Sequence, residues 1–217
     1  IHERLYAPLM ARLLELTRGL RVGHPFTDGT HVGPLINDAH RQSVQAYVEL
    51  AKREGGRVLC GGESPADPLL ANGSYFQPTI IEGLTNSARA CQEEIFGPIL
   101  PLLPFDTLEE AVSFVQDRPR PLALYLFTKS REVERAILDR IPFGGGCVND
   151  TVVHLSTPYL PFGGVGASGM GSYHGRASFE TFSHPKSILK KGAGPDLPVR
   201  YRPYAPWKEK LLRKFLP

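Results

Sequence analysis

Short apolar segments that resemble strands alternate with amphipathic segments that resemble helices along most of the chain, and this alternation restricts the fold more than any other feature. Alternation at this spacing is typical of an α/β domain whose largely parallel sheet is flanked by helices. The predicted helices cover 8–19, 38–55, 107–114 and 130–138, and the predicted strands cover 57–60, 79–81, 99–105, 123–128 and 143–149.

Local signals set several of these boundaries. Pro8 fits the first turn of a helix, and Gly19 is a suitable stop. Asp38 is the expected cap of the second helix. Thr107 and Glu110 have the spacing of a capping box. The prolines within 99–105 favour an edge strand there, since proline cannot donate a ladder hydrogen bond.

The totals limit the class of protein. A chain of 217 residues is long enough for one domain with a substantial core. It contains no apolar run of about 18 residues, so we predict no transmembrane helix. Because the chain opens with Ile1 instead of methionine, we expect a fragment or a processed product. It shows no secretory signal, and we expect it in the cytoplasm.

The three cysteines, Cys60, Cys91 and Cys147, lie far apart and form no CxxC pair. Neither a disulfide framework nor a metal site is therefore indicated. Each cysteine is predicted to be an inert, packed thiol.

The charge is unevenly distributed. From Lys186 onward nine basic residues face two acidic ones, whereas the rest of the chain has 16 basic and 20 acidic residues. We expect no nucleic-acid partner. The last apolar residues share one helical stripe among basic residues, which favours docking on its own protein over contact with an anionic membrane. This stripe consists of Trp207, Leu211, Leu212, Phe215 and Leu216.

The segment Glu93-Glu94-Ile95-Phe96-Gly97-Pro98 combines two carboxylates, an apolar pair and a Gly-Pro turn. Pro98 prevents a helix from continuing, and the apolar pair requires burial. We expect Glu94 and Phe96 on a stiff turn that leads into the next strand. On residue types alone, a capped turn with a solvated acid pair is the simpler interpretation.

Residues 164–169 match the pattern GxGxxG. A dinucleotide fingerprint has to follow a strand and open a helix. Here Pro161 and Phe162 precede the glycines and another Gly-rich turn follows, so a tight loop is the better interpretation.

Four blocks, in this order and at this spacing, resemble the aldehyde dehydrogenase superfamily. They are Gly33-Pro34-Leu35-Ile36, Tyr75 with Pro78-Thr79-Ile80, the Glu93–Pro98 segment, and Pro161-Phe162-Gly163-Gly164 with Ser168-Gly169. The second half is most similar to the class 3 branch. The resemblance implies the C-terminal portion of a catalytic domain over 1–185, incomplete at its N-terminus, and a basic tail over 186–217 that joins an oligomer contact.

The resemblance also assigns site residues. It implies that Glu94 binds the nicotinamide ribose of NAD or NADP and that Phe96 packs beside the nicotinamide ring. It implies that Phe162, Asn149 and His154 border the aldehyde substrate. On residue types alone, Phe162 is ordinary core, Asn149 makes a turn and His154 is structural.

The catalytic residues of the family have no counterpart in this chain. Family members oxidise an aldehyde to a carboxylic acid through a thiohemiacetal and a thioester on a cysteine in a GQxC-type sequence, with an upstream glutamate as general base. We therefore expect the isolated chain to be inactive. The alternative that stays open is a non-catalytic module that assembles with full-length subunits.

Overall fold

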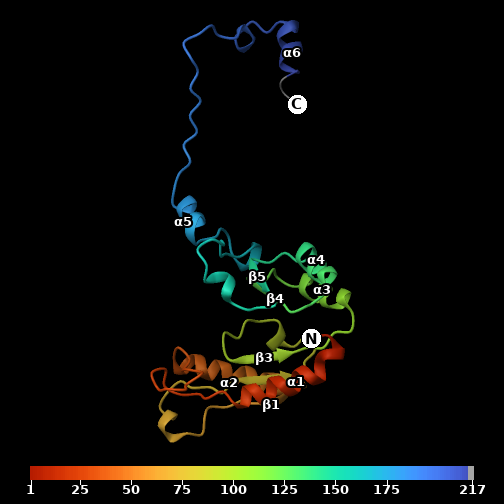
Figure 1. The fold of residues 1–217 in the computed structure, drawn as a ribbon, viewed down its shortest axis with the longest axis vertical. Coiled ribbons are helices and arrows are strands. Elements are labelled where there is room, and N and C mark those ends of the chain that lie inside the picture. Colours follow the sequence, from red (N-terminus) through yellow and green to blue (C-terminus); the bar gives the residue numbers. More distant parts are fainter. Residues whose placement is uncertain (215–217) are drawn as a thin grey trace. The chain divides into compact units, whose positions relative to one another are not determined.

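The computed structural model describes residues 1–214. The chain divides into two compact units, Ile1–Ser178 and a second unit that begins at Phe179 (Figure 1). The helices are α1 (Glu3–Arg18), α2 (Asp38–Arg53), α3 (Leu108–Gln116), α4 (Arg131–Arg140), α5 (Gly175–Thr181) and α6 (Pro206–Leu212), and the strands are β1 (Arg57–Cys60), β2 (Thr79–Glu82), β3 (Ile99–Leu102), β4 (Ala123–Leu126) and β5 (Gly145–Val148).

The first sheet has the order β1-β2-β3. β1 pairs with β2 in antiparallel orientation, and β2 pairs with β3 in parallel, with Thr79 opposite Ile99. β3 and its Pro101 therefore lie at an edge, as the prolines of this segment indicate.

Helices pack on both faces of this sheet (Figure 1). On β2, Ile81 lies in a buried cluster with Ala51 of α2, whereas the preceding residue, Ile80, lies in a cluster with Met10 of α1. Adjacent strand residues point to opposite faces. The first sheet is thus the middle layer of an α/β/α arrangement.

The second sheet is the parallel pair β4 and β5, in which Tyr125 lies opposite Cys147. Leu124 and Leu126 pack against a buried cluster that includes Val112 of α3 and Ile137 of α4. Tyr125 alternates with these leucines and so lies on the face of the sheet that α3 and α4 do not cover.

The α/β class is confirmed, and two of the three strand pairings are parallel. The sheet is divided into two small sheets. One helix boundary was wrong: α1 begins at Glu3, because the Nδ1 atom of His2 accepts a hydrogen bond from the backbone N–H of Arg4, and Pro8 lies inside the helix. The cap of α2 is Asn37, one residue before the predicted Asp38.

The second unit contains α6 and little other regular structure between residues 182 and 214. Lys208 is buried, and its Nζ atom donates hydrogen bonds to the carbonyl oxygens of Tyr201 and Pro203 at 2.7 and 2.9 Å. Phe215 and Leu216 of the predicted stripe lie outside the described residues. Over residues 1–214, no helix has the length and apolar character needed to cross a bilayer.

Candidate functional site

We call residues Glu93–Pro98 the carboxylate turn. It follows a 3-10 turn over Arg89–Cys91 and ends where β3 begins. Phe96 has a φ angle of 55°, a left-handed conformation that is uncommon for a residue with a side chain. A Cβ atom at Gly97 would lie 2.6 Å from Cγ2 of Val44. The turn is therefore pressed against α2.

The first carboxylate of the turn has side-chain partners. Tyr47 of α2 donates a hydrogen bond to Glu93 Oε2, and Arg89 Nε donates to Glu93 Oε1 at 2.7 Å. The hydrogen bond from Arg89 is the larger cause and that from Tyr47 the second, and together they hold the pKa of the Glu93 carboxyl below its ordinary value. The same interaction with Glu93 raises the pKa of Tyr47. Glu93 thus fixes the turn to its surroundings.

The second carboxylate is exposed, and none of the residues in 1–214 forms a hydrogen bond or an ion pair with the Glu94 side chain. A free carboxylate on a fixed turn can accept hydrogen bonds from a pair of hydroxyl groups. The two neighbouring acids therefore differ in their contacts: the Glu93 side chain is bonded within the fold, whereas that of Glu94 has no partner among residues 1–214.

Phe96 is held by its backbone. His40 of α2 donates from Nε2 to the carbonyl oxygen of Phe96 at 2.8 Å, and the two rings meet edge to face with centroids 6.5 Å apart. Ile95 packs against the clusters beneath the turn. The expected burial of the apolar pair is wrong for Phe96, whose side chain is 78% exposed. The left-handed backbone turns this ring outward while Ile95 points inward.

A second group of residues, the ring cluster, consists of Tyr125, His154, Phe162, Tyr173 and His174. The centroid of His154 lies 5.8 Å from that of Tyr125 and 5.7 Å from that of Phe162. Phe162 and Tyr173 exchange two backbone hydrogen bonds of 2.9 Å, and their rings meet edge to face. Phe162 and His154 are therefore neighbours on the face of the second sheet that carries Tyr125.

Asn149 lies at the carboxyl end of β5 with a φ angle of 59°. Its side-chain amide bonds both backbone groups of Thr128, accepting from the N–H and donating to the C=O at 2.9 Å each. The amide thus closes a turn at the end of the β4–β5 pair, which is the role that the residue type of Asn149 alone predicts.

Residues 164–169 do not have the context of a dinucleotide fingerprint. Gly166–Ser168 form a 3-10 turn, with no α-helix opened by the glycines. A Cβ at Gly164 would overlap the backbone of Ser168, which explains the glycine at that close approach.

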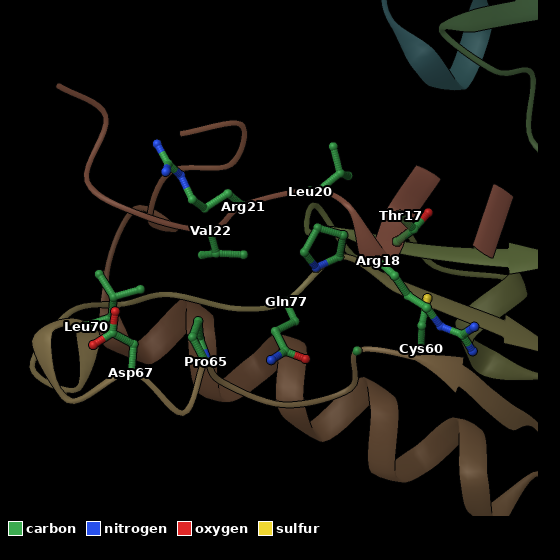
Figure 2. Close-up of a pocket in the computed structure, with 12 residues that line it drawn as sticks. Thr17, Arg18, Leu20, Arg21, Val22, Cys60, Pro65, Asp67, Leu70 and Gln77 are labelled. Carbon is green, nitrogen blue, oxygen red and sulfur yellow. The ribbon is translucent and has the colours of Figure 1, made fainter. Parts of the chain in front are cut away.

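A surface hollow of about 370 Å³ lies apart from these residues, between the end of α1 and the loops that flank β1 and β2 (Figure 2). Arg18, Arg21 and Asp67 are its charged lining residues. None of the five predicted site residues lines it. The Nη2 atom of Arg18 already donates to the carbonyl oxygen of Leu59 at 3.4 Å.

Three side-chain contacts near the predicted site residues were not predicted from the sequence. His40 and Tyr47 hold the carboxylate turn, and both lie on the helical face of Val44, so their i, i+4 and i+7 spacing was an available signal. Cys147 approaches His154, with Sγ 3.6 Å from Nδ1. Nothing in the sequence connects these two, because the chain between them is an irregular loop.

Solved structures share this fold. A substrate-bound AldH from Staphylococcus aureus matches the whole chain with a TM-score of 0.83 and 36% identity over 45% of its own length. A betaine aldehyde dehydrogenase from Staphylococcus aureus in complex with NAD+ matches 93% of this chain and 40% of its own, with a TM-score of 0.82 and 28% identity.

Proteins with similar sequences are aldehyde dehydrogenases, as these solved structures are. The 4,4'-diaponeurosporen-aldehyde dehydrogenase of Staphylococcus aureus is 38% identical over 94% of this chain and 42% of its own length, and the human aldehyde dehydrogenase family 3 member B1 is 39% identical over 84% and 37%. The aldehyde dehydrogenase family model matches residues 1–188. The chain belongs to the aldehyde dehydrogenase family, with the resemblance to class 3 confirmed, and it spans less than half the length of these relatives.

Proposed function

We propose that this chain forms part of an NAD(P)-dependent aldehyde dehydrogenase, in which Glu94 and Phe96 hold the nicotinamide half of the cofactor. One observation carries the proposal: a carboxylate without a partner among the described residues stands two positions from an exposed ring, on a turn fixed by His40, Tyr47 and Arg89.

The two side chains fit such a cofactor. The Glu94 carboxylate can accept hydrogen bonds from both hydroxyls of a ribose, and the Phe96 ring offers an apolar surface to a planar heterocycle. When bound, NAD(P) accepts a hydride from the substrate carbon. The role of the turn is orientation, because a nicotinamide that can rotate away from the substrate loses the advantage of a fixed geometry.

We further propose that the aldehyde lies against the ring cluster. Phe162 and His154 would form an apolar wall, and Asn149 would border it from the end of β5. The nucleophilic cysteine and the general base would come from polypeptide outside this chain, so the chain alone should reduce no cofactor. Residues 1–185 would complete the catalytic domain, and 186–217 would join subunits.

A chimera tests the proposal. In the 38% identical Staphylococcus aureus relative, the matching part is replaced by this chain. We expect aldehyde-dependent NAD(P)H formation, and we expect Glu94→Gln in the chimera to raise the KM for the cofactor by about tenfold, through loss of charged hydrogen bonds. Glu93→Asp, which keeps the charge beside Arg89, is the matched control and should change it far less.

Two results would contradict the proposal. One is a folded chimera that produces NAD(P)H equally well with Glu94→Gln. The other is NAD(P)H formation by the isolated chain. If the chimera does not fold, binding of nicotinamide mononucleotide by the isolated chain, followed by NMR, is the test.

The non-catalytic alternative rests on the second unit. Ile188 and Leu189 are 75% and 93% exposed within a basic segment, which is a surface suited to a partner subunit. Mixing the chain with a full-length family member and measuring mass by light scattering tests this. Mixed oligomers that disappear when residues 186–217 are removed would favour the module; unchanged masses would exclude it.

A further inference from the structure

Cys147 has no part in the cofactor or the substrate assignment, yet it lies beside His154, one of the residues proposed to border the aldehyde. Cys147 extends from β5, and His154 lies on a 3-10 turn over Val153–Leu155. The sulfur and the Nδ1 atom are 3.6 Å apart, which is within hydrogen-bonding distance for sulfur. A histidine in this position can take up the thiol proton.

The imidazole is held in place from several sides. His154 is only 7% exposed, and its ring contacts Tyr125 and Phe162. Gly145, two residues before Cys147, leaves room for it, since a Cβ there would lie 3.1 Å from the Cδ2 atom of His154. The ring therefore lies along β5 and cannot easily turn away from the sulfur.

The other ring nitrogen has no partner. The Nε2 atom of His154 is buried and makes no hydrogen bond with any residue in 1–214. The proton position on an imidazole is set by the bonds its two nitrogens make. With Nε2 unpaired, the Cys147 sulfur is the group that determines it. A Cys147 thiol that donates to Nδ1 selects the tautomer with the proton on Nε2, and this is the tautomer that can take up the thiol proton at Nδ1.

The other two cysteines lie in different surroundings. Burial raises the pKa of the Cys91 thiol, which disfavours its reactive thiolate form. Cys60 packs against the cluster that contains Met10 and Ile80. Neither has an imidazole within hydrogen-bonding distance among the described residues. All three thiols are only partly buried, so the comparison does not depend on one of them being inaccessible.

We propose that Cys147 is a modification site: a thiol activated by His154 that adds to small, uncharged α,β-unsaturated aldehydes. The sulfur forms a bond to the β-carbon, and the π electrons move toward the carbonyl group. The resulting enolate takes a proton at the α-carbon from the imidazolium that received the thiol proton. No oxidant or reductant is required.

The proposal that the thiol is activated rests only on the geometry of Cys147 and His154. Only the choice of a conjugated aldehyde rests on the proposed function, which brings aldehydes to the ring cluster. The rings of Tyr125 and Phe162 beside the pair favour an uncharged reagent.

The intact chain provides its own controls for the test. It is treated briefly with limiting iodoacetamide, and the alkylation rate of each cysteine is measured by peptide mass spectrometry. We expect Cys147 to react about tenfold faster than Cys60 and Cys91, because the thiolate is the form of cysteine that is alkylated. His154→Gln should reduce the Cys147 rate to that of the other two, whereas His174→Gln, elsewhere in the ring cluster, should not.

The contribution of the fold is checked in urea, where the three cysteines of the unfolded wild-type chain should react at similar rates. This comparison remains decisive if His154→Gln does not fold. Equal rates for the three cysteines in the native chain would overturn the proposal. So would a fast Cys147 in a folded His154→Gln variant.

The class of electrophile is tested separately with trans-2-hexenal and hexanal. We expect Cys147 to retain one intact hexenal as a stable thioether and to retain no hexanal after desalting, since a saturated aldehyde adds reversibly. A Cys147 that reacts rapidly with iodoacetamide but not with hexenal would support the activated thiol and overturn the choice of electrophile. Neither result depends on cofactor reduction, so the proposed function can fail independently.

Discussion

The carboxylate turn and the ring cluster are fixed in the fold by different interactions. The turn is held by polar side chains, with His40 and Tyr47 reaching it from α2 and Gly97 pressed on Val44. The ring cluster lies on a two-stranded sheet whose backbones approach closely at glycines, and its rings contact one another. Polar substitutions should therefore loosen the turn without unfolding the chain, whereas geometry and stability are coupled around the ring cluster.

The largest expected effect distinguishes two neighbouring glycines beneath the ring cluster. A Cβ at Gly146 would overlap the carbonyl oxygen of Leu124, whereas one at Gly145 would meet only the side chain of His154. We expect Gly146→Ala to lower the free energy of unfolding by about 3 kcal/mol and Gly145→Ala by about 1 kcal/mol. Urea denaturation measures both. Equal losses would show that backbone approach does not determine stability there.

The next effect concerns the contact beneath the turn. Gly97→Ala should cost about 2 kcal/mol, because its new methyl group would lie 2.6 Å from Cγ2 of Val44. Val44→Ala, at a fully buried position, should cost about 2 kcal/mol alone. The double variant should lose less than the sum of the two, since the smaller residue makes room. Strict additivity would mean that the turn does not press on α2.

The hydrogen bonds that hold the carboxylate turn should affect the mobility of the turn more than the free energy of unfolding of the chain. Tyr47→Phe removes the hydrogen bond to Glu93, an exposed pair that contributes little to the free energy of unfolding. We expect amide hydrogen exchange over residues 93–98 to become faster while the unfolding midpoint hardly changes. Glu49→Gln, which breaks the exposed ion pair with Lys52 on the same helix, is the control. Faster exchange in that variant as well would assign the effect to α2 in general.

The smallest expected effect is a change in the pKa of the Glu93 carboxyl. The pKa of Glu93 is lowered in the folded chain, first by its bond with Arg89. Its stabilising contribution is therefore complete above the ordinary glutamate pKa and is lost as the pH falls through the lower, folded value. Carboxyl NMR should show a Glu93 midpoint below the ordinary value, and Arg89→Gln should raise it. An unchanged midpoint in Arg89→Gln would contradict this bond.

Local signals explain why much of the fold could be predicted. Ser130 and Thr107 cap their helices, and the strand segments have the expected apolar residues, so periodicity placed most elements. The start of α1 was missed because histidine is an unusual N-cap and Pro8 suggested a later beginning. The division into two small sheets depends on strand pairing between distant segments, which no local pattern specifies.

The site was less predictable because its contacts are not local. Residue types alone favoured a buried Phe96, and only the positive φ angle explains why its ring points outward. The bond from His40 crosses 56 positions of the chain. The family resemblance drew attention to Glu94, but it did not reveal that Glu93 is the anchored member of the pair. That distinction came from the contacts with Tyr47 and Arg89.

The most direct test of the central claim is an NMR titration of the isotope-labelled chain with nicotinamide mononucleotide. We predict that the largest amide shift changes fall at Glu94, Phe96 and their neighbours, and that Glu94→Gln abolishes them while Glu93→Asp preserves them. Saturable shift changes elsewhere on the chain, with residues 93–98 unaffected, would contradict the assignment of the carboxylate turn to the cofactor.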